Sequence, residues 1–177
     1  MYKISKLIKL NQRLYHTKDL AKIWGISNQN TLYTTIKRYV EKGILIPIFK
    51  GLYSTIPLEQ VDPIEIGSSI AHRYAYLSTE YVLAEKGIIQ QAIDKYTFIS
   101  NFSRRIKVGE FNFLFRKLKD EFLFNPIGIE KKDNSFIAST ERAVADLLYF
   151  NPHYHFDLPH NINWNEVRNI QKLIGYK

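Results

Sequence analysis

The chain has 177 residues, 45% of them hydrophobic and 24% charged, which is the composition of a folded globular protein of one or two domains. It has no cysteine, which excludes disulfides, thiolate nucleophiles and cysteine-ligated metals, and it has no run of about 20 apolar residues that could span a membrane. The broken apolar pattern of residues 1–10 does not fit a signal peptide, so we expect a cytoplasmic protein.

Positive charge is concentrated in the first third of the chain. Residues 1–53 hold ten Lys and Arg against two Asp and Glu, whereas residues 54–177 hold fifteen against fifteen. A positive field confined to one part of a protein is typical of nucleic-acid binding. We therefore expect a basic domain over residues 1–56 and a second, electrically balanced domain over residues 57–177.

Three helices are predicted in the basic domain. Apolar residues at helical spacing favour a helix over residues 2–14, whose lysines are expected on the outer side, either solvated or in contact with phosphates. A second helix begins at Thr17, a capping residue, and ends at Gly25, which readily adopts the positive φ found at helix ends. A third helix follows after a short turn and extends to about Lys42. Two helices joined in this way are typical of a helix-turn-helix.

The third predicted helix has an apolar side, expected to pack on the second helix, and a polar side that faces away from it. The polar side and the turn before it carry amide, hydroxyl and cationic groups suited to base edges and phosphates: Asn28, Gln29, Asn30, Tyr33, Thr34, Lys37 and Arg38. Asn30 lies near the beginning of the helix, where base edges are usually reached. Arg38 lies two turns later, and we expect it to bind a phosphate rather than a base.

A β-hairpin is predicted after the third helix. Residues 44–49 and 52–54 are β-like, and Lys50-Gly51 between them forms a tight turn with a basic tip. A helix-turn-helix followed by a hairpin is the pattern of a winged helix, in which Lys50 and Lys18 are the expected phosphate contacts. Some winged helices bind protein instead of DNA. The concentration of positive charge favours DNA here.

Residues 57–177 are predicted to form a mixed α/β domain with a small antiparallel sheet, so that the whole chain belongs to the α+β class. Periodicity and capping residues predict helices over residues 63–73, 78–86 and 164–174, and a further helix after Ser139. Alternating or β-rich segments predict strands over residues 75–77, 96–100, 106–118, 122–124 and 136–138.

One charged set stands out in the second domain. Arg142 and Asp146 are four residues apart on the helix after Ser139 and can form an ion pair, with Glu141 to the side. The set is either a functional patch of this domain or an ordinary ion pair on the surface of an amphipathic helix.

Neither a metal site nor a catalytic site is predicted. His153, His155, Asp157 and His160 could ligate a metal, but the segment that holds them has no regular framework to fix four ligands. The chain also lacks a phosphate-binding glycine loop, a nucleophile elbow and a paired-carboxylate signature for Mg²⁺. We expect a protein that is not an enzyme and that needs no cofactor.

Five short segments stand out in order along the chain: Thr-Lys-Asp-Leu at 17–20, Lys-Gly-Leu-Tyr at 50–53, Tyr-Leu-Ser at 76–78, Thr-Phe-Ile-Ser at 97–100 and, most specific, Ala-Ser-Thr-Glu-Arg-Ala-Val-Ala-Asp-Leu-Leu-Tyr at 138–149. In these segments the sequence resembles the AbiEi-type antitoxins of bacterial abortive-infection, or type IV, toxin-antitoxin systems. The resemblance implies an N-terminal DNA-binding domain that represses its own operon. It also implies a C-terminal domain that counters a nucleotidyltransferase-like toxin encoded next door, as part of phage defence.

The expected function is therefore that of a sequence-specific transcriptional repressor and antitoxin. Its expected partners are double-stranded operator DNA with inverted repeats and, functionally, the toxin; no membrane partner is expected. The alternative is a ligand-responsive winged-helix transcription factor unrelated to a toxin. The aromatic-rich second domain would then bind a small molecule.

Overall fold

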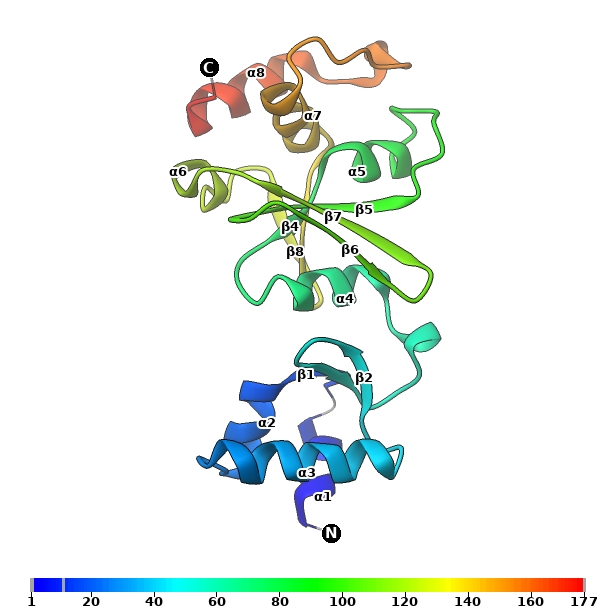
Figure 1. Ribbon diagram of the computed structural model, residues 1–177. Helices are drawn as coiled ribbons and strands as arrows, with labels where there is room; N and C mark the ends of the chain where they lie inside the picture. The colour runs from blue at the N-terminus through cyan, green and yellow to red at the C-terminus, as the bar shows by residue number, and fades with distance from the viewer. Residues whose placement is uncertain (1, 11, 177) are drawn as a thin grey trace. The chain divides into compact units, whose positions relative to one another are not determined.

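The computed structural model describes residues 2–10 and 12–176 and is an α+β structure, with eight α-helices and two sheets in these residues (Figure 1). The chain divides into two compact units, Met1–Asp62 (unit 1) and Pro63–Lys177 (unit 2). Unit 1 thus extends to residue 62, beyond the boundary after residue 56 expected from the sequence. In the part of the chain that is described, no helix is both long and apolar enough to cross a membrane.

Unit 1 consists of three helices and a three-stranded antiparallel sheet. The elements are α1 (Tyr2–Leu10), β1 (Leu14–His16), α2 (Thr17–Trp24), α3 (Gln29–Glu41), β2 (Ile46–Phe49), β3 (Leu52–Ser54) and a 3-10 helix at Leu58–Gln60. The strand order is β1-β3-β2, so that β3 is central.

The first helix is shorter than the sequence predicts. It ends at Leu10, residue 11 lies outside the described residues, and residues 14–16 form a strand instead of a last helical turn. Leu14 lies opposite Ser54 and His16 opposite Leu52 in an antiparallel ladder with β3. The strand β3 begins at Leu52, 38 residues after the first residue of β1. Pairing with this distant strand overrides the local helical periodicity of residues 14–16.

The beginning of α2 is tied to the turn of the hairpin. His16, not Thr17, is the N-cap residue, and its backbone N–H donates to the Asp19 carboxylate at 3.1 Å. Thr17 instead donates its backbone N–H to the carbonyl of Gly51 at 2.9 Å. Gly51 occupies the hairpin turn with φ of 74°, a conformation that favours glycine. The first turn of α2 and the hairpin turn therefore lie next to each other within unit 1.

The core of unit 1 lies between its helices and the sheet. Its buried residues are Leu7, Tyr15, Leu20, Trp24, Leu32, Ile36 and Leu45, and the Trp24 ring stacks on Tyr39 at 5.1 Å. Two lysines of α1 pack against this core rather than facing outward as expected. Lys6 donates to the carbonyl of Ile23 at 3.2 Å, near the C-terminal end of α2, and the ammonium of Lys3 lies 5.8 Å from the Trp24 ring centre.

Unit 2 is a six-stranded sheet with helices on both faces. The helices are α4 (Pro63–Ile70), α5 (Thr79–Glu85), α6 (Asp120–Leu123), α7 (Thr140–Phe150), α8 (Trp164–Ile174) and a 3-10 helix at Pro159–Asn161. The strands are β4 (Tyr76–Leu77), β5 (Lys95–Ser100), β6 (Arg104–Val108), β7 (Phe111–Lys117), β8 (Ile129–Lys132) and β9 (Ser135–Ala138). The helix α4 covers one face of the sheet, and α5 and α7 cover the other (Figure 1).

Two sequence predictions for unit 2 are wrong. The sheet, in the order β6-β7-β5-β4-β9-β8, is mixed rather than antiparallel, because β5 runs parallel to β7 and β4 runs parallel to β9. Residues 122–124, predicted as a strand, lie instead in α6 and at its C-terminal end. An apolar run of three residues does not distinguish a strand from one helical turn.

The close approach of α4 to the sheet depends on Gly67. A Cβ atom at this position would lie 2.3 Å from a ring carbon of Phe98, the buried side chain at the middle of β5. Phe98 has no room to move, because it is fully buried between the two helical layers and stacks on Phe115 at 5.6 Å. This packing therefore requires glycine, which has no Cβ atom, at position 67.

Replacing Gly67 with Ala should destabilise unit 2 although Ala is the better helix former. The gain in helix propensity is about 1 kcal/mol, whereas overpacking a core costs about 1–3 kcal/mol. Urea unfolding measured by the fluorescence of Trp164, in a Trp24→Phe background, gives the free energy of unfolding of unit 2. Ser69→Ala in the same helix is the control and should leave stability unchanged; an unchanged value for Gly67→Ala would contradict the packing argument.

Candidate functional site

The outer side of α3 is a polar, solvent-exposed surface of unit 1. Leu32 and Ile36 are buried against the core, whereas residues 28–31, 33 and 34 face solvent. Every residue that the sequence assigned to DNA contact is exposed: Lys18, Asn28, Gln29, Asn30, Tyr33, Thr34, Lys37, Arg38 and Lys50. Tyr33 is 55% exposed although it is aromatic.

Some of these side chains have structural partners within α3. The Asn28 side-chain oxygen caps the helix and accepts hydrogen bonds from the backbone N–H and the hydroxyl of Thr31, at 3.0 and 3.2 Å. Thr34 donates its hydroxyl to the carbonyl of Asn30 at 2.8 Å. Asn28 therefore has a role in stabilising α3 that the sequence prediction did not assign to it.

The basic residues predicted to contact DNA lie at two places in unit 1. Lys37 and Arg38 lie in the second half of α3, and Lys37 forms an exposed ion pair of 3.9 Å with Glu41, which contributes little to stability. Lys18 lies in the first turn of α2 and Lys50 in the hairpin turn, and the hydrogen bond from Thr17 to Gly51 brings these two turns together. Amide and hydroxyl groups at the beginning of α3 are thus accompanied by positive charge at its end and on the hairpin.

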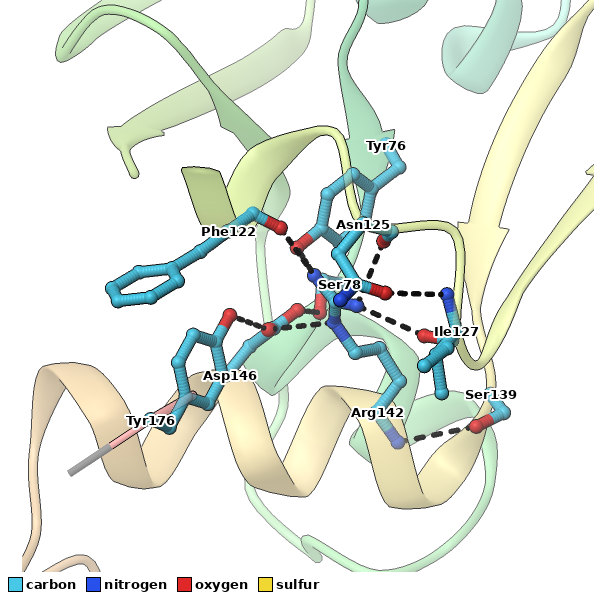
Figure 2. Close-up of polar contacts among 9 residues, drawn as sticks. All are labelled: Tyr76, Ser78, Phe122, Asn125, Ile127, Ser139, Arg142, Asp146 and Tyr176. Atoms are coloured by element: carbon cyan, nitrogen blue, oxygen red, sulfur yellow. Dashed lines mark hydrogen bonds and ion pairs between the residues drawn. The ribbon is translucent and has the colours of Figure 1, made fainter. Parts of the chain in front are cut away.

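A second polar assembly lies in the interior of unit 2 and is centred on Arg142 (Figure 2). Its guanidinium donates from Nε to Asp146 at 2.9 Å, from Nη1 to the carbonyls of Asn125 and Ile127 at 3.1 and 2.9 Å, and from Nη2 to the Tyr76 hydroxyl and the Phe122 carbonyl at 2.7 and 3.3 Å. All five N–H groups of the guanidinium have an acceptor. The Arg142 side chain is 0% exposed, so each of these bonds replaces one to water.

Asp146 completes this assembly. Its Oδ1 accepts from Arg142 and from the Tyr176 hydroxyl at 2.5 Å, and its Oδ2 accepts from the Ser78 hydroxyl at 2.8 Å. Ser78 precedes α5 as its N-cap residue, but its hydroxyl goes to Asp146 rather than to the helix. Ser139 caps α7 as expected, accepting from the backbone N–H of Arg142 at 3.1 Å.

The protonation of the assembly follows from its burial. Burial, and then the charge of Asp146, raise the pKa values of the Tyr76 and Tyr176 phenols, so both keep their protons. Burial lowers the pKa of Arg142, but Asp146, Tyr76 and Tyr176 together raise it by more, and the guanidinium remains charged. Burial raises the pKa of Asp146, while the charge of Arg142 and the three hydrogen bonds to its oxygens oppose this rise.

The sequence predicted the pairing of Arg142 with Asp146 but not its location. Both side chains are 0% exposed, and Glu141 lies outside the assembly, so these three residues do not form a surface patch. Local sequence could not identify the other members, because Tyr76, Ser78 and Tyr176 are 66, 68 and 30 residues away from the groups they bind. The neighbours of the pair gave one indication of its burial in the sequence. Residues 143–145 and 147 are all apolar, and all four are buried in the structure.

Unit 2 also has a surface hollow of about 360 Å³ beside α5, β7 and α7. Arg116 on its wall donates to Glu80 at 2.6 Å and lies 5.4 Å from the ring centre of Phe150, and Tyr154 also contributes to the lining. No metal-binding set of three His, Cys, Asp or Glu occurs within residues 2–10 and 12–176. In the His-rich segment, Asp157 accepts the backbone N–H of Gln90 at 2.7 Å.

A scan of the chain against models of protein families finds no match, and a comparison with the sequences of curated proteins finds none either.

Removing the Arg142 charge should strongly destabilise unit 2. Arg142→Met leaves Asp146 buried without its cation and frees three carbonyls, and breaking a buried pair in this way costs about 3–5 kcal/mol. Arg142→Lys should also be destabilised, because an ammonium has three donors and cannot reach acceptors spread over five directions. Tyr176→Phe should cost less, about 1–3 kcal/mol, for one lost hydrogen bond to a buried carboxyl.

These variants can be compared by urea unfolding with the Trp164 fluorescence signal. Arg168→Met in α8 is the matched control, because Arg168 is exposed and its one hydrogen bond within the described residues goes to Asn165, three residues away. Wild-type stability of Arg142→Met would show that the guanidinium is not the structural centre of unit 2.

Proposed function

We propose that unit 1 is a winged helix-turn-helix that binds double-stranded operator DNA, and that the protein is an autorepressing antitoxin of the type IV toxin-antitoxin class. The observation that carries the DNA-binding part is the exposed side of α3, where every contact residue predicted on this helix faces solvent. The proposal assigns no catalysis and no cofactor to either unit.

The order of elements in unit 1 supports the winged-helix assignment. The helices α2 and α3 are joined by a short turn, a hairpin follows, and β1 adds a third strand beside β3. In such domains the second helix of the pair lies in the major groove and contacts base edges through its N-terminal residues. The α3 helix is the corresponding element here, and Gln29 and Asn30 occupy its beginning.

The distribution of charge supports DNA as the partner of unit 1 rather than unit 2. Residues 1–53 contain ten basic and only two acidic residues, whereas residues 54–177 contain fifteen of each. Lysines on the hairpin and on α2 would release counterions from phosphates, a contribution that does not depend on base sequence.

The antitoxin part of the proposal rests on the resemblance of the sequence to the AbiEi-type family. The most specific segment of that resemblance, residues 138–149, runs through α7 and includes Arg142 and Asp146. The burial of Arg142 and Asp146 supports a role of this segment in maintaining the fold of unit 2. We propose that unit 2 is the part of the protein that counters a nucleotidyltransferase-like toxin.

The surface hollow in unit 2 favours a second candidate function, a ligand-responsive transcription factor. Its volume falls within the range of small-molecule sites, and its lining combines an ion pair with aromatic rings. The genes beside this one distinguish the two candidates, because a toxin-like reading frame favours the antitoxin and a metabolic operon favours the ligand-responsive regulator.

Substitutions in unit 1 should separate two kinds of DNA contact. Asn30→Ala should weaken operator binding by about 1–3 kcal/mol and leave binding to random DNA nearly unchanged, because it removes a base contact. Lys50→Ala or Lys18→Ala should weaken both and flatten the slope of log affinity against log salt by about one unit. Gel shifts on the protein's own promoter and on random DNA at several salt concentrations measure both effects.

Lys172→Ala, on the exposed side of α8, is the control for these shifts and should bind like the unsubstituted protein. If Asn30→Ala left the ratio of operator to random affinity unchanged while Lys50→Ala altered it, α3 would not be the element that reads the bases.

Toxin neutralisation should depend on unit 2 and not on DNA binding. Expressed from an independent promoter together with the adjacent toxin gene, the full chain and its Lys18→Ala/Lys50→Ala variant should both restore growth. A chain that ends at Asp62 should not. Rescue by the short chain would move the activity to unit 1, and the lack of any toxin gene beside this one would contradict the antitoxin proposal.

A further inference from the structure

The first half of α3 carries no cation. Its exposed residues after the cap are Gln29, Asn30, Thr31, Tyr33 and Thr34, and the first basic residue is Lys37. At 1.5 Å per residue, Lys37 lies about 10 Å farther along the helix axis than Asn30. Arginine and lysine are the side chains that most often recognise guanine, through its O6 and N7 atoms. The part of α3 expected to meet base edges therefore lacks the groups that read G·C pairs.

Hydrogen bonds within α3 limit which polar groups remain for a base. The threonine hydroxyls are used locally, since Thr31 donates to Asn28 at 3.2 Å, Thr34 to the Asn30 carbonyl at 2.8 Å and Thr35 to the Thr31 carbonyl at 2.7 Å. The side-chain amides of Gln29 and Asn30 are exposed, and neither has a hydrogen-bond partner among the described residues. An amide offers a donor beside an acceptor, which matches the N6 and N7 atoms of adenine.

The same half of α3 presents apolar groups to solvent. The back-bond of Thr34 holds its hydroxyl against the helix backbone, so its γ-methyl is the apolar part of an exposed side chain. Tyr33, its neighbour, is 55% exposed. In the major groove the matching apolar feature is the 5-methyl group of thymine. Adenine and thymine thus each have a complementary group within one turn of α3.

We propose that α3 reads A·T base pairs, with the amide of Gln29 or Asn30 on adenine and with Thr34 and Tyr33 on the thymine methyl. This inference rests on the proposed DNA-binding function and names the sequence class that the same surface recognises. The cations of unit 1 contribute affinity through phosphates, and the neutral half of α3 selects the bases.

The test begins with the selection of binding sites from random duplex DNA by the full-length protein at physiological salt. We expect a half-site dominated by A·T pairs. Replacing thymine with uracil in this half-site removes only the methyl group and should weaken binding about threefold to fivefold at the contacted positions. Replacing adenine with 7-deazaadenine removes the N7 acceptor and should weaken binding about tenfold.

A pair of matched variants assigns the methyl contact. Thr34→Ser keeps the hydroxyl and its back-bond but removes the γ-methyl, so the ratio of thymine to uracil affinity should fall, with the remaining difference due to Tyr33. Thr35→Ser makes the same change on a neighbouring residue that has the same kind of back-bond but is half-buried, and it should keep the ratio.

The outcomes separate the inference from the function on which it rests. A specific half-site built on G·C pairs would overturn the inference and leave DNA binding intact. An A·T-rich site that is insensitive to both base analogues would also overturn it, because DNA shape rather than α3 would then select the sequence. Equal affinity for selected and random DNA would overturn the proposed function itself.

Discussion

The burial of one guanidinium organises unit 2. A charge removed from water must find a partner for every donor, and Arg142 does so with five bonds to five different groups. These bonds join α7 to β4 through Tyr76 and to the segment 122–127 through backbone carbonyls. Asp146 extends the assembly to Ser78 before α5 and to Tyr176 near the end of the chain. Elements distant in sequence are thereby held to one buried ion pair.

Unit 1 has the opposite arrangement, with an apolar core and its polar groups outside. Packing of Leu32 and Ile36 fixes the rotation of α3 and therefore determines which side chains face solvent. The hydrogen bond from the backbone N–H of Thr17 to the carbonyl of Gly51 holds the hairpin turn, which carries Lys50, next to the first turn of α2. The chain thus combines a basic region, residues 1–53, with a remainder in which basic and acidic residues balance and in which the Arg142–Asp146 pair is buried.

The sequence predicted elements well where the information is local. The last helix was predicted over 164–174 and occupies Trp164–Ile174, and the strand predicted over 96–100 begins one residue earlier, at Lys95. Periodicity, a capping Asn163 and a terminal Gly175 suffice for such a helix. The exposure of the α3 residues also follows from its apolar stripe, so the contact residues predicted on this helix lie on the surface of unit 1.

Predictions failed where the deciding partner is distant. Residues 14–16 are a strand only because β3 pairs with them, and the parallel pairs β5·β7 and β4·β9 depend on connections that periodicity does not encode. Arg142 and Asp146 looked like a surface pair because their acceptors and donors lie in other elements. The cap role of Asn28 was missed because capping and base contact use the same residue types.

The division of labour between the two units is the central claim, and the reactivity of lysines tests it most directly. The full-length protein, free and bound to its own promoter, is treated with an acetylating reagent, and each lysine is quantified by mass spectrometry. We predict that DNA protects Lys18 and Lys50, while Lys131 and Lys132 on the exposed strand β8 react equally in both states. Protection of the unit 2 lysines with no change at Lys18 and Lys50 would contradict the account.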